Sequence, residues 1–379
     1  MTTTPERTMP RQVSQRVSQS VFDGSRLRVV LLVDVHDGAQ QQFLEAYERL
    51  CAHVAAVPGH VGEQLCQSIE NPSQWLITSE WESAPPFLDW VNSEDHVRMV
   101  RPLHHCVRDT RSLRFNVLRE VGAGRPAAEA AQHRPQPFPR TGDGVIRHAL
   151  TFTVKPGSER TVARILSRHA APEARVDDTT RLLRTSLFLH GNRVVRAIEV
   201  RGDLLAALRH VAQQPQVRAV EEALNPYLEQ HRDLDDPDSA RVFFTRAALP
   251  AVHHVARDTE AGAEGERHAL YYPARPGGGM RLAEALAQRD ETAADDPGSP
   301  VLRSTIFQRG DVVVRMIDVR GGPDADPAGL LGLADAGRVA ELTTLLDGGH
   351  GTPAGDGDPG RLLALARMEP LTHRRSPGA

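Results

Sequence analysis

The chain has 379 residues, of which 40% are hydrophobic and 25% charged, which is too long for one ordinary domain and enough for two or three compact cores. Its formal net charge of −4 provides no basic field for a phosphate backbone, so nucleic acid is not an expected partner. No run of about 18 apolar residues predicts a membrane span, and without a signal-peptide pattern we expect a cytoplasmic protein.

Composition divides the chain into thirds. Residues 1–24 are polar and predict a disordered tail, while Gly122 to Gly144 and Ala251 to Glu266 have linker composition. We therefore expect three modules, at residues 25–121, 145–250 and 266–372.

The second and third modules are predicted to be an internal repeat of roughly 120 residues. Three segments recur at matching offsets, each with the same pattern of residue types: Arg147–Leu150 as Arg267–Leu270, Leu183–Phe188 as Leu302–Phe307, and Arg196–Gly202 as Arg315–Gly321.

Within each module the hydrophobic period changes in the order strand, helix, strand, strand, helix, strand, which predicts an α+β fold of three ferredoxin-like units of the dimeric α/β-barrel type. The first module gives this order most clearly: a strand at 29–35, a helix at 43–54, a hairpin of 61–70 with 75–81, a helix from 87 and a strand at 113–117. In the third module we expect Gly348 to Gly360 to be a mobile loop, followed by an apolar strand at Leu362 to Met368.

Two His/Arg pairs stand on apolar strand faces. His148 and Arg196 occupy the adjacent first and third strands of the second module, and His268 and Arg315 repeat this in the third, with Tyr272 on the same face as His268. One reading is a buried arginine satisfied by a carboxylate or by backbone. The other is a pocket in which arginine binds an anion and histidine exchanges a proton.

All three tryptophans, Trp75, Trp81 and Trp90, fall in the first module. Trp75 and Trp81 are six residues apart on one strand and so face the same side. They would either pack in the core or form a flat cavity wall for a planar polycyclic ligand.

His96, His104 and His105 follow nearby without metal-ligand spacing. They are surface residues or, for His96 or His104, a general base. Three cysteines without a CxxC pattern predict reduced thiols and no metal site. No phosphate-binding glycine loop is present, so we expect no cofactor.

The first module resembles the antibiotic-biosynthesis monooxygenase family, through Val57–Val61, Trp75–Ser83 and Ser93–His96. The second resembles the tetracenomycin-type polyketide cyclases, through Asn225–Leu228 and Asp238–Phe244. Modules two and three together resemble the SchA/CurD-like proteins of polyketide clusters.

These resemblances imply a tailoring enzyme of type II aromatic polyketide biosynthesis. The expected activity is a cofactor-independent monooxygenase that uses O₂ to oxidise a polycyclic phenol or anthrone to a quinone. Two alternatives remain open: a polyketide cyclase, and a non-catalytic chaperone of cyclisation that works beside other polyketide cyclases.

The number of modules predicts the assembly. A ferredoxin-like module leaves one sheet face uncovered and pairs with a second module. Modules two and three are expected to pair within the chain, and module one with its copy in a second chain, which gives a homodimer.

Overall fold

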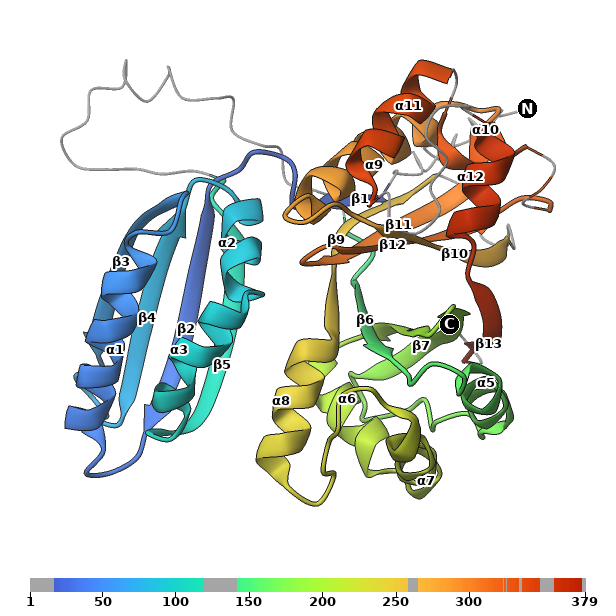
Figure 1. Cartoon of the computed structure of the whole chain (residues 1–379). Coiled ribbons are helices and arrows are strands. Elements are labelled where there is room, and N and C mark those ends of the chain that lie inside the picture. Colours follow the sequence, from blue (N-terminus) through green and yellow to red (C-terminus); the bar gives the residue numbers. More distant parts are fainter. Residues whose placement is uncertain are drawn as a thin grey trace, which may run out of the picture.

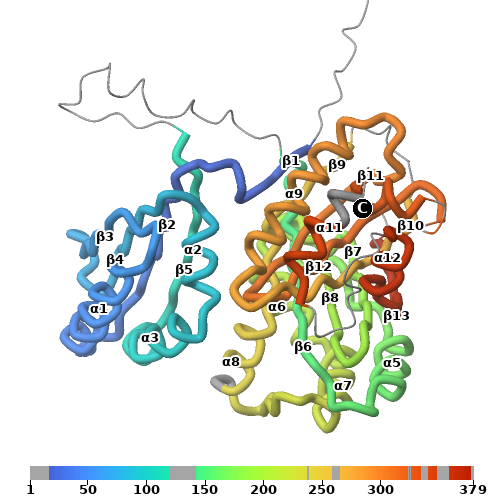
Figure 2. Tube along the Cα trace, turned by 45° about the horizontal axis from the view of Figure 1, so that its top comes forward, coloured from blue at the N-terminus to red at the C-terminus, as the bar shows by residue number. Residues whose placement is uncertain are grey.

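The computed structural model describes residues 17–118, 142–257, 265–322, 324, 326–333, 336–347 and 358–376. Figures 1 and 2 show their arrangement from two directions. Residues 1–16 of the expected tail, 122–141 of the first expected linker and 348–357 of the expected loop lie outside the described residues. The predicted α+β fold, with a ferredoxin-like first module, is confirmed.

The first module is a separate four-stranded antiparallel sheet in the order β3-β4-β2-β5, with three helices on one face (Figure 1). The alternation in β2 buries Val29, Val33 and Val35 beneath the helices and leaves Leu32 43% exposed on the other face. The elements are β2 (Leu27–Val35), α1 (Gln40–Val54), β3 (His60–Gln67), β4 (Gln74–Trp81), α2 (Ala84–Val91), α3 (Glu94–His104) and β5 (Val107–Asn116).

The rest of the chain repeats the same order of elements twice. The second module contains β6 (Val145–Thr153), α5 (Glu159–Arg168), β7 (Arg181–His190), β8 (Arg193–Arg201), α6 (Leu204–Gln213), α7 (Pro215–Leu224), the 3₁₀ turn η1 (Asn225–Tyr227), α8 (Pro237–Ala247) and β9 (Ala248–Ala256). The third contains β10 (Glu266–Pro273), α9 (Gly279–Asp295), β11 (Val301–Arg309), β12 (Val312–Val319), α10 (Pro327–Leu331), α11 (Ala336–Leu345), α12 (Pro359–Ala366) and β13 (Glu369–Arg375).

The two repeats share one sheet, in the order β10-β12-β11-β9-β6-β8-β7-β13. Strand β9 pairs with β6 of its own module through residues 248–250 and with β11 of the other module through 251–256. Strand β13 follows Met368, whose N–H donates to Ala269 of β10 at 2.9 Å, and then pairs with β7. Each last strand therefore crosses to the other copy and closes the sheet into a barrel, which is the predicted pairing within the chain.

The barrel interior combines small and aromatic apolar side chains with a buried charge network. Phe188 and Phe307 pack with Ala149 and Ala269. Between the two repeats lie two arginines and two carboxylates, none of which the sequence analysis identified: Arg184, Glu199, Arg267 and Asp318.

The predicted disordered tail is wrong from residue 17 onward. Strand β1 (Val17–Ser20) pairs with β9, from Val17 opposite Ala256 to Ser20 opposite His253. Strand β6 reaches only residues 248–250 of β9, which leaves an open edge that another strand can satisfy.

The predicted linker at 251–266 is also wrong at both ends. Residues 251–256 continue β9, and Glu266 begins β10. The polar character that suggested a linker comes partly from His254, which is 3% exposed and whose Nδ1 lies 2.9 Å from the hydroxyl of Thr305. These polar side chains lie inside a protein body rather than in solvent.

The predicted strand at 362–368 is instead helix α12. Asp358 caps the helix through its carboxylate, which accepts from Gly360 N–H at 2.9 Å, and Pro359 occupies the first turn. Leu362, Leu363 and Ala366 follow helical spacing and are buried. The closing strand comes later, at β13.

Candidate functional site

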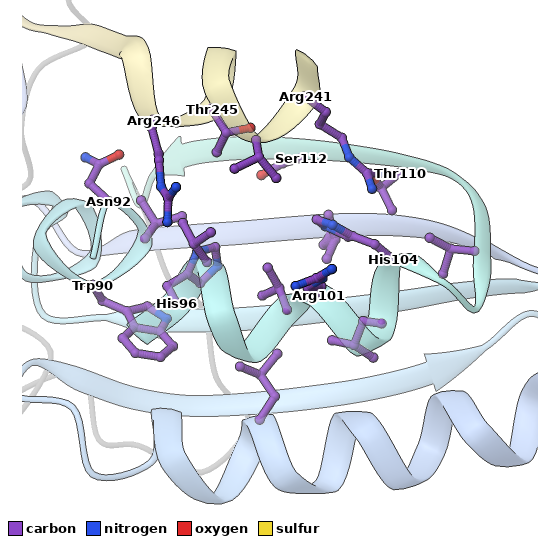
Figure 3. A pocket seen from close by; sticks show the side chains of 18 of the residues that line it. Trp90, Asn92, His96, Arg101, His104, Thr110, Ser112, Arg241, Thr245 and Arg246 are labelled. Carbon is purple, nitrogen blue, oxygen red and sulfur yellow. The ribbon is translucent and has the colours of Figure 1, made fainter. Parts of the chain in front are cut away.

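A cavity of about 710 Å³ lies in the first module, between the helices and the face of the sheet that they cover. Helix α8 of the second module and Arg309 at the end of β11 line its other side. Figure 3 shows α8 above β5, with side chains of α3 and α8 pointing into the same space. The cavity is therefore built by two parts of the chain that are far apart in sequence.

The sheet side of the cavity is apolar and aromatic. Trp81 is 1% exposed and meets the ring of Phe87 edge to face at 5.4 Å. Its indole N–H donates to the Ser79 hydroxyl at 3.1 Å, so its polar atom is satisfied within the wall. With Val29 and Ile77, these residues form a surface suited to a flat, apolar ligand.

His96 lies on the opposite wall, in the first turn of α3. The hydroxyl of Ser93 accepts from the His96 backbone N–H at 3.1 Å and so caps the helix. The imidazole meets the ring of Trp90 edge to face at 5.3 Å. Burial, aided by the nearby charges of His104, Arg309 and Arg114, lowers the pKa of His96 to about 4, so the ring is neutral at pH 7 and able to accept a proton.

His104 stands at the other end of α3 and also lines the cavity, with Arg101 one turn before it (Figure 3). Their spacing of three residues places both on one side of the helix. The structure therefore brings four of the predicted site residues to one cavity: His96, His104, Trp81 and Trp90.

Arg114, on β5, lines the cavity as well and was missed by the sequence analysis. Its guanidinium lies 5.3 Å from the centre of the Phe87 ring, within cation–π range. The side chain is exposed to the cavity, yet loss of hydration lowers its pKa because protein surrounds that space. The sequence could have indicated Arg114 as a cavity residue, because it lies two residues after Ser112 and therefore on the same, helix-facing side of the edge strand β5.

Trp75 faces the same side of the sheet as Trp81, as predicted, but does not line the cavity. Its ring packs on Phe43 at 5.4 Å, and its indole N–H donates to Pro72 O at 3.0 Å. It belongs to the core beneath α1.

His148 and Arg196 lie outside the cavity. Arg196 forms an ion pair with Glu221 of α7, which also binds Arg232 at 2.7 Å. Burial, followed by the charge of Arg114, lowers the pKa of His148 to about 4. Arg196 is therefore held against the helices of its own module.

His268 and Arg315 are buried in the third module. Arg315 is 1% exposed and donates to Asp290 at 2.9 and 2.5 Å and to Leu330 O at 2.7 Å. Burial lowers the pKa of His268, and burial raises that of Tyr272 to about 12. Tyr272 also lines a smaller cavity of about 250 Å³ at α12. Arg315 matches the first of the two predictions for these pairs, a buried arginine that is satisfied by a carboxylate and by backbone.

Within the described ranges, no three His, Cys, Asp or Glu side chains gather in a way that could hold a metal ion. Searching those same ranges for a helix long and apolar enough to span a membrane also finds none.

Comparison with known proteins matches the first and second modules to two separate families. Residues 26–102 match the family model described as antibiotic biosynthesis monooxygenase, and residues 145–257 match the SchA/CurD like domain. Among solved structures, SnoaB, a cofactor-independent oxygenase from Streptomyces nogalater, aligns over 26% of this chain and 96% of that chain, with 18% identity and a TM-score of 0.24.

The full-length relatives are closer. A 42.8 kDa protein in the whiE locus of Streptomyces coelicolor is 61% identical over 96% of this chain and 91% of its own length. Protein SchA of Streptomyces halstedii is 59% identical over 97% of this chain and 98% of its own. Polyketide synthase CurD of Streptomyces cyaneus is 59% identical over 96% of this chain and 98% of its own length. Identity at this level over nearly the whole length means that the chain belongs to the SchA/CurD family.

Proposed function

We propose that this protein is a tailoring monooxygenase of aromatic polyketide biosynthesis, and that its first module oxidises a polycyclic phenol or anthrone to a quinone. The observation that carries the proposal is His96, a neutral imidazole in a cavity with an aromatic wall. The monooxygenase family match to the same module and the polyketide context of the SchA/CurD relatives support it.

The reaction balances without a cofactor. Oxidation of an anthrone methylene carbon to a carbonyl releases four electrons, which one O₂ accepts: one oxygen atom forms the carbonyl and the other leaves as water. A base first removes a proton, and the resulting electron-rich anion transfers an electron to O₂. A carbon–oxygen bond then forms, the oxygen–oxygen bond breaks, and the carbon loses its second hydrogen as a proton.

The protein's residues would supply the base and stabilise the anion. His96 accepts the first proton, while positive charge from Arg114 stabilises the negative charge that develops on the ring. The positive charges of Arg309 and Arg114, which help to lower the pKa of His96, also lower the pKa of a phenol or anthrone bound beside them. Once that ligand has lost its proton, its negative charge stabilises the protonated form of His96. The aromatic wall formed by Trp81 would hold the ring and exclude water.

A cyclase or a chaperone would not consume O₂, so this is the discriminating measurement. The purified protein is incubated with an anthrone under air and under nitrogen, while O₂ uptake and quinone are measured. We expect one O₂ consumed for each quinone formed, in air alone. Ring closure or unchanged substrate without O₂ uptake would overturn the proposal.

The residue-level test is His96→Gln, which keeps a polar side chain of similar size but removes the base. We expect kcat to fall about 10²–10⁴-fold. His36→Gln changes an exposed histidine of the same module that does not line the cavity, and should retain full activity.

A further inference from the structure

Arginines outnumber carboxylates among the residues that line the cavity, and most of these arginines come from outside the first module. Five arginines and two carboxylates line it. Three of the arginines, Arg241, Arg246 and Arg309, belong to the barrel formed by modules two and three. An apolar ring system would gain only cation–π attraction from these arginines, whereas an anion would gain charge-assisted hydrogen bonds.

Two of these arginines lie beside the helix that carries His96. Arg246 forms a bidentate ion pair with Glu94, the first residue of α3, at 3.2 and 2.8 Å. Arg309 donates to Asn92 O at 3.4 Å, directly before α3, and to the carbonyls of Thr245 and Ala248 at the end of α8. Figure 3 shows Arg246 extending from α8 toward His96.

Arg114 lies opposite, on β5, in the first module. Among the described residues, no carboxylate forms an ion pair with it, and its one recorded partner is the face of Phe87. Its side chain is exposed to the cavity, where loss of hydration lowers its pKa. A ligand that brings a negative charge to the cavity would meet Arg114 and Arg309 there and form charge-assisted hydrogen bonds with them.

We propose that the barrel supplies the anion-recognising wall of the oxygenase cavity, so that the site selects polycyclic ligands carrying an oxyanion beside the ring. The oxyanion is a carboxylate or an ionised phenol. This inference rests on the proposed function for the identity of the ligand as an aromatic polyketide. It also gives the barrel a role in substrate recognition, with Arg309 and Arg246 as specificity-determining residues.

The test is binding rather than turnover, so it stands apart from oxygenation. Three anthraquinones that differ only at C2 serve as probes: the 2-carboxylate, the 2-hydroxyl and the 2-methyl compound. Dissociation constants are measured under nitrogen from pH 6 to 9. We expect the carboxylate to bind about tenfold or more tightly than the methyl compound throughout, or the hydroxyl compound to gain that advantage only as its phenol ionises. The first result identifies a carboxylate and the second a phenolate, while equal affinity of all three at every pH would overturn the proposal.

Variants then test which arginines bind the anion. Arg114→Met and Arg309→Met should abolish the preference for the anionic probe while leaving affinity for the methyl probe within about twofold. Arg309→Lys keeps the charge and should restore part of the preference. Arg218→Met is the matched control, because Arg218 is an exposed, ion-paired arginine of the second module that does not line the cavity. Unchanged preference in Arg309→Met would contradict the inference, because Arg309 is the residue of this pair that belongs to the barrel.

The ion pair of Arg246 with Glu94 offers a second reading, in which Arg246 only ties α8 to α3. Glu94→Gln separates the two. If Arg246 binds the ligand anion, removing its carboxylate partner should preserve or increase the preference for the anionic probe, whereas Arg246→Met should reduce it. Equal losses in both variants would assign Arg246 a purely structural role. If quinone formation fails in the oxygenation assay while the anion preference stands, the proposed function falls and the binding wall remains.

Discussion

Arg267 lies 2.7 Å from Glu199, and this ion pair joins the two copies of the internal repeat inside the barrel. Arg267 also binds Asp318 of its own module at 2.6 Å, and Arg184 of the other module binds Asp318 at 2.9 Å. Although burial opposes ionisation, the hydrogen bond and charge of Arg267 and the charge of Arg184 hold the pKa of Asp318 at about 2. Four charges are thus shared between the repeats, and three of them, Glu199, Arg267 and Asp318, are buried.

Replacing Arg267 should strongly destabilise the barrel. Arg267→Met leaves Glu199 and Asp318 with a single shared arginine, and breaking a buried pair in this way costs about 3–5 kcal/mol. Urea unfolding monitored by circular dichroism would measure the loss.

Arg303→Met serves as the control for the Arg267 prediction. Arg303 is 37% exposed and lies 3.8 Å from Asp318, so its loss should cost no more than about 1 kcal/mol. Similar midpoints for the wild type and Arg267→Met would show that the network contributes little.

The modules could be predicted because strand alternation and the repeat are both visible directly in the sequence. The prediction was wrong for segments whose structure depends on a partner far away along the chain. Strand β1 forms because β9 leaves an edge open, and that edge exists only once the barrel has closed. The apolar run at Leu362 could not be separated from a strand by periodicity alone, although Asp358 and Pro359 were available as helix-start signals.

The site was predicted in part for the same reason. His96, His104, Trp81 and Trp90 come from one module, where order along the chain places them close together. The cationic wall was missed because Arg246 and Arg309 lie far along the chain and reach the cavity only through the contact between two bodies. For Arg315 the sequence left two readings open, because an arginine on an apolar strand face does not show whether a carboxylate elsewhere pairs with it, and Asp290 does so.

Two half-buried histidines, His96 and His148, should make stability depend on pH. The pKa values of His96 and His148 are lowered to about 4, mainly by burial, whereas an unfolded histidine titrates near 6.5. Between these values the unfolded state binds more protons than the folded state. The free energy of unfolding should therefore fall as pH drops from about 6.5 to 4, by at most about 1.4 kcal/mol per pH unit for each histidine.

Urea midpoints at half-unit pH intervals would measure that dependence. His148→Leu removes one titrating group that lies outside the cavity, so it should flatten the profile between pH 4 and 6.5. A wild-type profile that is flat across this window would contradict the predicted shifts.

Substitutions of the two tryptophans of β4, Trp81 and Trp75, should affect quinone formation differently, because Trp81 lines the cavity and Trp75 does not. Trp81→Phe shrinks the cavity wall and removes part of the stacking surface, so kcat/KM for quinone formation should fall about 2- to 10-fold, the range expected for aromatic contacts. Trp75→Phe changes a core residue outside the cavity and should leave kcat/KM unchanged. Equal effects on kcat/KM would place the ligand elsewhere.

The first module should mediate a homodimer. Its sheet face opposite the helices carries an apolar stripe in which Leu32 is 43% and Phe115 51% exposed, with Val30, Leu76 and Leu113 half-buried beside them. No described element covers this face (Figure 1). The corresponding sheets of modules two and three are closed on each other, so within the described part of the chain the matching surface is that of a second copy of the first module.

Light scattering of the full chain should give the mass of a dimer. Leu32→Glu places a charge at the centre of the stripe, and burying that charge against its own copy is unfavourable, so this variant should be monomeric with an intact fold. Leu205→Glu, at a 52% exposed position on α6, adds the same charge away from the stripe and should remain dimeric. A monomeric wild type, or a dimer that persists in Leu32→Glu, would mean that the stripe is not the interface.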